Sequence, residues 1–94
     1  MIIYKATNTI NNKCYIGQTI HPLNTRKYNH RFKASKPTKS YFHRAIHKYG
    51  WDSFIWETLC ECKNQKELDE MEYHYIKQYK MLGDVYNITD GGRG

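Results

Sequence analysis

The sequence predicts a small α/β domain in which helices flank a three-stranded antiparallel sheet. Three short segments are rich in β-branched and aromatic residues, as strands are, and three longer segments have the periodicity and capping residues of α-helices. The chain has 94 residues, which suffice for one modest hydrophobic core and are too few for two. We therefore treat residues 1–94 as a single domain.

The first two strands are expected to form a hairpin. Residues 2–7 have strand composition, turn residues follow over 8–12, and strand composition resumes over 14–17. If the turn centres near residues 9 and 10, Tyr4 lies opposite Tyr15 in the pairing. Both phenol rings would then share one face of the sheet.

Two helices are expected between Pro22 and Gly50. Pro22 is typical of the first turn of a helix, and we expect that helix over residues 23–34. Pro37 separates it from the second helix, which Ser40 is suited to cap and which Gly50 ends. On the first helix, four polar residues share one stripe at the spacing i, i+3, i+4, i+7: Arg26, Asn29, His30 and Lys33.

A third strand over residues 53–60 and a third helix are expected to complete the domain. Asn64 and Glu67 form a capping-box pattern, and the helix should run to about Tyr79 and break at Gly83. Residues 86–88 read as a short extended piece. The glycine-rich residues 90–94 are expected to lack regular structure, as the start of a flexible linker would.

Composition limits the cellular setting. There is no apolar run of the length of a membrane helix and no signal-peptide pattern, so we expect no membrane partner. Three cysteines, an odd number, argue against a disulfide framework and for reduced thiols in the cytoplasm. A zinc site formed by Cys60, Cys62 and His74 is the alternative, although it lacks a fourth ligand.

Positive charge is concentrated in one part of the chain. The net charge is +6, and residues 21–50 carry eight lysines and arginines with no acidic residue. Residues 51–80 reverse this balance, with seven acidic residues and four lysines. This asymmetry indicates a surface that binds phosphate groups, or else an ordinary solvated basic face.

The helical periodicity places the carboxylate of Glu72 on the apolar face of its helix. On a helical wheel it falls between Tyr79 and Ile76, on the apolar face. Burying a carboxylate is costly unless it is paired or coordinates a cation. We therefore expect either a basic partner such as Arg26 or a metal, and a single ion, because the first fifty residues contain no carboxylate.

These residue types match the needs of phosphodiester hydrolysis. That reaction requires a cation for the phosphate, a group that deprotonates water, and donors for the developing negative charge. Glu72, the two tyrosines Tyr4 and Tyr15, Arg26 and His30 could supply these parts.

The same residues resemble the GIY-YIG nuclease family, closest to the catalytic domains of phage-type homing endonucleases. "IIY" at Ile2 to Tyr4 resembles the first signature and "YIG" at Tyr15 to Gly17 is the second, with ten residues between them. "RKYNH", "EMEYHYIKQY" and "YNITDGG" resemble three further motifs, and match the family's site residues at Arg26, His30, Glu72 and Asn87. The resemblance covers nearly the whole chain.

The resemblance implies a metal-dependent endonuclease that acts on double-stranded DNA. Glu72 would hold one Mg²⁺ or Mn²⁺, and Tyr4, alone or with Tyr15 or His30, would activate the attacking water. Tyr15 could equally only orient the water, so the resemblance leaves open which tyrosine activates it. Because a tyrosine is a weak base at its usual pKa of about 10, this role needs the metal and Arg26 to lower that pKa. Arg26 would also stabilise the phosphorane-like charge, and Asn87 would support the site. The expected DNA contacts are Lys27, Arg31, Lys33, Lys36, Lys39, His43, Arg44 and Lys48.

The sequence departs from the family pattern in two places. Ile2 replaces the first glycine, and the loop at residues 37–39 lacks a histidine that some homing members carry. His43 is a candidate substitute. Homing members take much of their sequence preference from a separate C-terminal DNA-binding domain, so we expect this chain to be either an isolated catalytic domain that lacks such a partner or a complete small nuclease. The main rival to the nuclease interpretation is a non-catalytic, basic nucleic-acid-binding module of the same fold.

Overall fold

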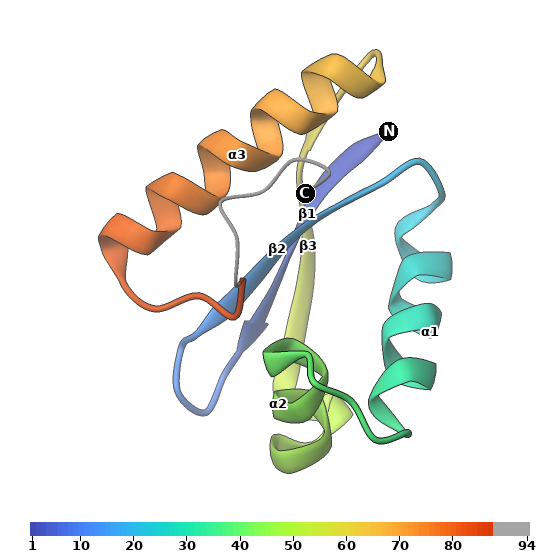
Figure 1. The fold of residues 1–94 in the computed structure, drawn as a ribbon, viewed down its shortest axis with the longest axis vertical. Helices are drawn as coiled ribbons and strands as arrows, with labels where there is room; N and C mark the ends of the chain where they lie inside the picture. Colours follow the sequence, from blue (N-terminus) through green and yellow to red (C-terminus); the bar gives the residue numbers. More distant parts are fainter. Residues whose placement is uncertain (88–94) are drawn as a thin grey trace.

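The computed structural model describes residues 1–87, so the extension expected at Ile88 and the linker expected at residues 90–94 lie outside it. The elements are β1 (Ile2–Asn8), β2 (Cys14–Thr19), α1 (Leu23–Ala34), α2 (Tyr41–Tyr49), a single 3₁₀ turn (Trp51–Ser53), β3 (Phe54–Glu61) and α3 (Gln65–Leu82) (Figure 1). Within these residues, none of the helices combines the length and the hydropathy that a bilayer span requires.

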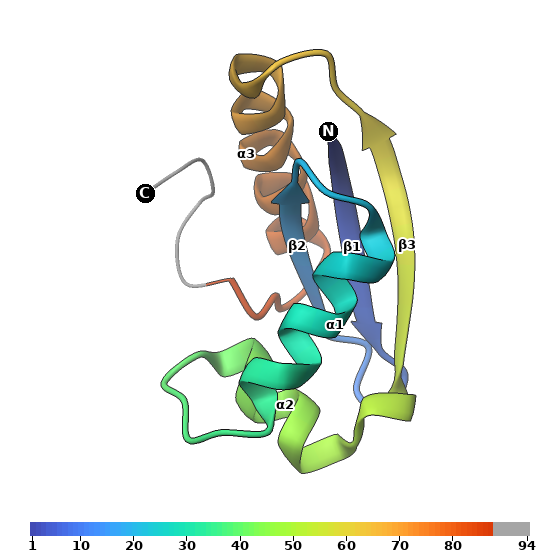
Figure 2. The ribbon, with the colours of Figure 1, turned by 90° about the vertical axis from the view of Figure 1, so that its right-hand side faces the viewer.

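The three strands form one antiparallel sheet in the order β2-β1-β3, so the N-terminal strand is central. Helix α3 lies on one face of this sheet, and α1 and α2 lie on the other (Figures 1 and 2). The expected fold class is confirmed.

Alternation along β1 builds a separate hydrophobic cluster on each face. Ile3 packs with Leu68 and Ile76 of α3, whereas Ala6 packs with Phe42 and other buried residues of α1 and α2. Because β1 is hydrogen-bonded to a strand on each side, its backbone is fixed, and its side chains have defined positions on both faces of the sheet. This central strand carries Tyr4 on the face of α1 and α2.

The hairpin register differs from the prediction by two residues. Tyr4 pairs opposite Gly17, and Tyr15 pairs opposite Ala6. The turn lies further along the chain than expected, because the amide of Asn8 bonds to the carbonyl of Lys13 and Asn12 adopts a left-handed φ of 65°. A shift by an even number of residues keeps side chains on the same face, so Tyr4 and Tyr15 still meet, with ring centroids 6.2 Å apart.

The helix boundaries follow their expected caps. The Ser40 side chain accepts a hydrogen bond from the amide of His43 at 3.3 Å, and the Asn64 side chain accepts one from the amide of Glu67 at 2.8 Å. Gly50, with a φ of 95°, ends α2. Helix α3 runs to Leu82, three residues beyond the predicted end.

Candidate active site

The absence of a side chain at Gly17 makes room for the phenol of Tyr4. A Cβ at Gly17 would collide with Cζ and the hydroxyl oxygen of Tyr4, and would lie 2.9 Å from Cε2 of Tyr15. Tyr4 therefore extends from the central strand across the neighbouring edge strand β2. The glycine of the second signature is required by this close approach.

Helix α1 brings two polar side chains to the Tyr4 hydroxyl. Nε2 of His30 lies 2.6 Å from the phenol oxygen, and Nε of Arg26 donates to the same oxygen at 3.3 Å. Arg26 and His30 are four residues apart and so share one face of the helix. The expected grouping of Tyr4, Arg26 and His30 is present.

His43 of α2 also reaches this group, through His30. Its Nε2 lies 2.8 Å from Nδ1 of His30, so a continuous row of hydrogen bonds joins His43, His30 and Tyr4. His43 is half-buried, whereas Tyr4 has no exposed surface. The sequence analysis assigned His43 to DNA contacts; the structure places it at the outer end of the row.

Burial dominates the protonation of this row. It raises the pKa of Tyr4 above the ordinary value of 10.0, with a further increase from Tyr15, and the opposing effect of Arg26 is smaller. Arg26 does lower the pKa of Tyr4, as expected, but in the domain alone this effect is too small to offset burial. Burial, followed by the positive charge of Arg26, holds the pKa of His30 far below 6.5. Tyr4 is a phenol and His30 a neutral imidazole at neutral pH.

Tyr15 occupies a different environment beside Tyr4. Its ring is stacked on Phe42, with centroids 4.2 Å apart and planes 3° apart. The residue is half-buried. Burial raises the pKa of Tyr15 above its ordinary value, and the positive charge of Arg26 offsets only part of this increase. Tyr15 thus both packs in the core and faces the surface near the Tyr4 hydroxyl.

Glu72 is buried, as its helix position predicts, with 7% of its surface exposed. It lies close enough to raise the pKa of both Tyr4 and Tyr15. The side-chain amide of Gln18 donates to Oε1 of Glu72 at 3.2 Å. Sequence reasoning anticipated Arg26 or a metal as partner and overlooked Gln18, whose signal was a polar residue on the α3 face of β2, where Cys14 and Ile16 are buried.

Asn87 ties the end of the described chain to β2. Its amide nitrogen donates to the carbonyl of Ile16 at 2.7 Å, and its side-chain oxygen accepts from the amide of Ile16 at 3.0 Å. The side chain thus pairs with the edge strand as a backbone segment would. Because Ile16 lies between Tyr15 and Gly17, Asn87 fixes the strand that carries the second signature.

Trp56 of β3 is a further site residue that the sequence analysis did not single out. Its ring is stacked near Tyr4 at a centroid distance of 6.0 Å and lies 5.7 Å from His30. Nζ of Lys27 lies 5.9 Å from its centroid. The residue forms the wall of the site on the side of β3, a position that only the pairing of β1 with β3 reveals.

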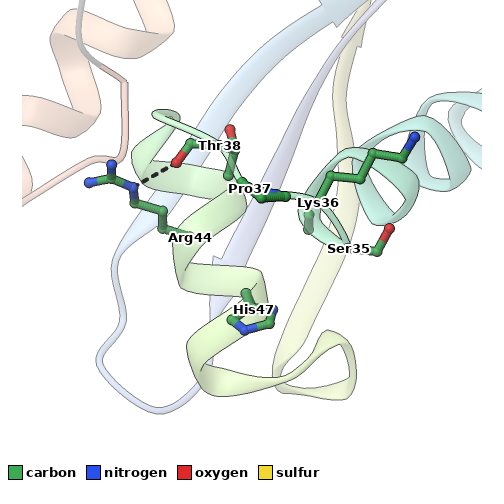
Figure 3. Close-up of a pocket in the computed structure, with 7 residues that line it drawn as sticks. Ser35, Lys36, Pro37, Thr38, Arg44 and His47 are labelled. Atoms are coloured by element: carbon green, nitrogen blue, oxygen red, sulfur yellow. Dashed lines mark hydrogen bonds between the residues drawn. The ribbon is translucent and has the colours of Figure 1, made fainter.

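The basic residues expected to contact DNA are mostly on the surface. Lys27 and His43 are half-buried, and the exposed ones are Arg31, Lys33, Lys36, Lys39, Arg44 and Lys48. A cavity of about 330 Å³ lies among them where the loop after α1 meets α2. Figure 3 shows Lys36 at the α1 end of this loop and Arg44 on α2, with Nε of Arg44 donating to the carbonyl of Thr38 at 2.8 Å.

The alternative zinc site is not formed. Sγ of Cys60 and Sγ of Cys62 lie 3.9 Å apart, but no group of three or more metal-ligating His, Cys, Asp or Glu side chains comes together in residues 1–87. Burial and the neighbouring Cys60 raise the pKa of Cys62 to about 11, which keeps this thiol protonated. These thiols pack against α3 as part of the core.

Comparison with known families identifies the family of the chain. The family model of the GIY-YIG catalytic domain matches residues 1–87, so the chain belongs to the GIY-YIG family of nuclease domains. Among its relatives are two proteins of Enterobacteria phage T4 named as the endonucleases segD and segB, 33% and 34% identical over 99% and 97% of this chain. Protein 146R of Invertebrate iridescent virus 6 is 33% identical over 89% of the chain. The chain spans between 35% and 39% of the length of these relatives.

Solved structures match the fold over almost its whole length. The catalytic domain of the intron endonuclease I-TevI, in a mutant form, superposes with a TM-score of 0.83 and is 27% identical, covering 98% of this chain and 96% of that one. A second structure, of the catalytic domain of the homing endonuclease I-TevI, gives a TM-score of 0.73. The predicted resemblance to homing-endonuclease catalytic domains is confirmed at the level of fold and family.

Proposed function

We propose that this chain is the catalytic domain of a homing-type endonuclease that hydrolyses phosphodiester bonds in double-stranded DNA with one divalent cation. The observation that carries the proposal is the contact of one buried phenol, Tyr4, with both His30 and Arg26, close to the buried carboxylate of Glu72. A purely structural core would gain little from gathering these four groups.

Glu72 is the residue that would hold the cation, Mg²⁺ or Mn²⁺. Hard cations prefer carboxylate oxygens, and Mg²⁺ is usually bound through one or two carboxylates together with water and substrate phosphate. A buried carboxylate whose charge acts on both Tyr4 and Tyr15 fits that donor set. When bound, the cation supplies neutralisation of phosphate charge and a more acidic water.

Tyr4 would accept a proton from the attacking water while its own hydroxyl proton moves to His30. As the phenol oxygen takes up the water's proton, its O–H proton moves to Nε2 of His30, and the Nδ1 proton of His30 moves to Nε2 of His43. This path requires neutral His30 with its proton on Nδ1. It explains how a tyrosine with a raised pKa can serve, because no free phenolate has to form beforehand.

Access to Tyr4 depends on its two half-buried neighbours. Tyr4 has no exposed surface, so water reaches its hydroxyl past Tyr15 and Arg26. Binding of the scissile phosphate by Arg26 would turn that guanidinium from the phenol and open the path. Arg26 would then stabilise the charge on the phosphorane-like transition state, and Tyr15 would orient the water.

The acid-free surface of α1 and α2 would bind the DNA backbone. The seven lysines and arginines assigned to DNA contacts would carry this role, and the cavity beside Lys36 and Arg44 would receive a backbone group (Figure 3). Such contacts give affinity that is independent of sequence and weakened by salt. A C-terminal DNA-binding domain beyond this chain would supply sequence preference, in line with the greater length of the relatives. The three free cysteines fit an intracellular, reducing setting.

The experiment is cleavage of supercoiled plasmid at low salt by the purified domain with Mg²⁺, with Mn²⁺ and with excess EDTA. Metal-dependent nicking or linearisation supports the nuclease. Stoichiometric DNA binding with no cleavage at any metal concentration would contradict it and favour the non-catalytic binding module, which needs only the basic surface.

A further inference from the structure

Gln18 occupies the centre of a closed network of hydrogen bonds between β2 and α3. Its amide nitrogen donates both to Oδ1 of Asp69 at 2.9 Å and to Oε1 of Glu72 at 3.2 Å. Its carbonyl oxygen accepts from the amide of Gln65 at 2.7 Å, and the same Gln65 amide donates to Oδ1 of Asp69 at 2.8 Å. One amide thus bridges two carboxylates that stand three residues apart on α3.

The network allows Gln18 only one orientation. If its amide were flipped, the carbonyl oxygen would face two carboxylates and the nitrogen would face the donor of Gln65. Both changes would replace attraction by repulsion. Gln65 and Asp69 therefore hold the donor end of Gln18 on the carboxylate of Glu72.

The contact with Gln18 limits the rotation of the Glu72 carboxylate, which determines where its oxygens point toward a metal. The last torsion of a glutamate side chain is broad and leaves the carboxylate plane free to turn. The hydrogen bond to Oε1 restricts that rotation, and the neighbouring charge of Asp69 makes the position more attractive to a cation. Groups that orient a ligating side chain typically change metal affinity by about 10- to 100-fold.

We propose that Gln18 is a positioning residue for the metal-binding carboxylate of Glu72, and that Gln65 and Asp69 keep Gln18 in its working orientation. This inference rests on the proposed function, because it presupposes that Glu72 binds the cation. It assigns to a residue outside the family signatures a role in metal affinity, with no direct contact to the DNA or to the water.

The test is a titration of the whole domain with Mn²⁺, followed by electron paramagnetic resonance, which detects the free ion. Gln18→Asn keeps the amide but is one methylene too short to reach α3, and Gln18→Leu removes the amide. We expect both to weaken Mn²⁺ binding about 10-fold or more and to raise the Mn²⁺ concentration needed for half-maximal cleavage in parallel. Gln78→Leu, the same substitution on the exposed face of α3, should match the wild type.

Two further measurements keep the failures apart. If Gln18→Asn binds Mn²⁺ as the wild type does and only its free energy of unfolding in EDTA is reduced, Gln18 is a structural clamp and the inference is wrong. If Glu72→Gln itself binds Mn²⁺ as tightly as the wild type, the metal assignment in the proposed function fails, and the inference fails with it. Loss of binding in Glu72→Gln and weakened binding in both Gln18 variants supports the two together.

Discussion

The phenol oxygen of Tyr4 lies 2.6 Å from Nε2 of His30, and both residues are almost wholly buried. A hydrogen bond of this length between a phenol and a neutral imidazole gives Tyr4 a place to send its proton. The sequence left open whether Tyr4 or Tyr15 activates the water. The row that continues to His43 favours Tyr4, since only an outward path allows the proton to leave a buried group.

Replacing each tyrosine by phenylalanine tests this assignment. Tyr4→Phe removes the proton acceptor and should lower kcat by about 10²- to 10⁴-fold, the usual contribution of general base catalysis. Tyr15→Phe keeps the stacking on Phe42 and should lower kcat by much less. Single-turnover cleavage with saturating domain measures both, and a larger loss in Tyr15→Phe would exchange the roles of the two tyrosines.

The buried neutral state of His30 should make the domain sensitive to acid. In the folded chain the pKa of His30 lies below its ordinary value of 6.5, so the unfolded chain binds a proton first as the pH falls. The stability that this neutral histidine allows is complete above about pH 6.5 and should be lost below it, by at most about 1.4 kcal/mol per pH unit. Urea unfolding of the wild type and His30→Gln between pH 7.5 and 5 measures this. We expect a shallower pH dependence for His30→Gln; parallel curves would contradict the burial of a neutral imidazole.

The close approach of Tyr4 to Gly17 predicts a selective effect of adding one methyl group. Gly17→Ala should push the buried phenol away from β2, which would reduce the free energy of unfolding by about 1–3 kcal/mol and also reduce cleavage. Gly83→Ala is the matched control, because a Cβ at Gly83 meets nothing within 4 Å. Denaturant unfolding and plasmid cleavage should separate the two, and equal behaviour of both variants would show that the Tyr4 ring can yield without cost.

Arg26 and Lys36 are both cations of the same basic surface, but their expected roles differ. Arg26→Ala should lower kcat by about 10²- to 10³-fold, as loss of a donor to the transition state does, with little change in DNA affinity. Lys36→Ala should leave kcat nearly unchanged, weaken binding, and reduce the slope of log affinity against log salt by about one. Cleavage rates at saturation and binding isotherms at several salt concentrations measure these effects. If Arg26→Ala lost affinity alone, Arg26 would belong with the DNA-positioning residues.

Local patterns in the sequence predicted most of the elements and their order. Strand composition, Ser40 and Asn64 as caps, and Gly50 as a stop are short-range signals, and the structure follows them. The burial of Glu72 could be read from its place on the helical wheel. The hairpin register could not be predicted from the sequence, because it depends on the position of the turn within a five-residue loop. The left-handed backbone of Asn12 sets that position.

The partners of the site residues depended on packing between distant elements. Gln18 meets Glu72 only because α3 crosses the edge strand β2, and His43 meets His30 only because α2 packs beside α1. Likewise, the effect of Arg26 on the pKa of Tyr4 could be given a direction from charge alone. Its smaller size relative to the effect of burial required the three-dimensional structure.

The central claim is that Glu72 holds the cation on which cleavage depends. Its most direct test compares Glu72→Gln with Glu70→Gln, an identical change of charge at an exposed position of the same helix. Both variants would be assayed for plasmid cleavage in Mn²⁺ and for DNA binding in EDTA. We expect Glu72→Gln to lose cleavage while it binds DNA at least as well as the wild type, and Glu70→Gln to retain both activities. Undiminished cleavage by a folded Glu72→Gln would contradict the account.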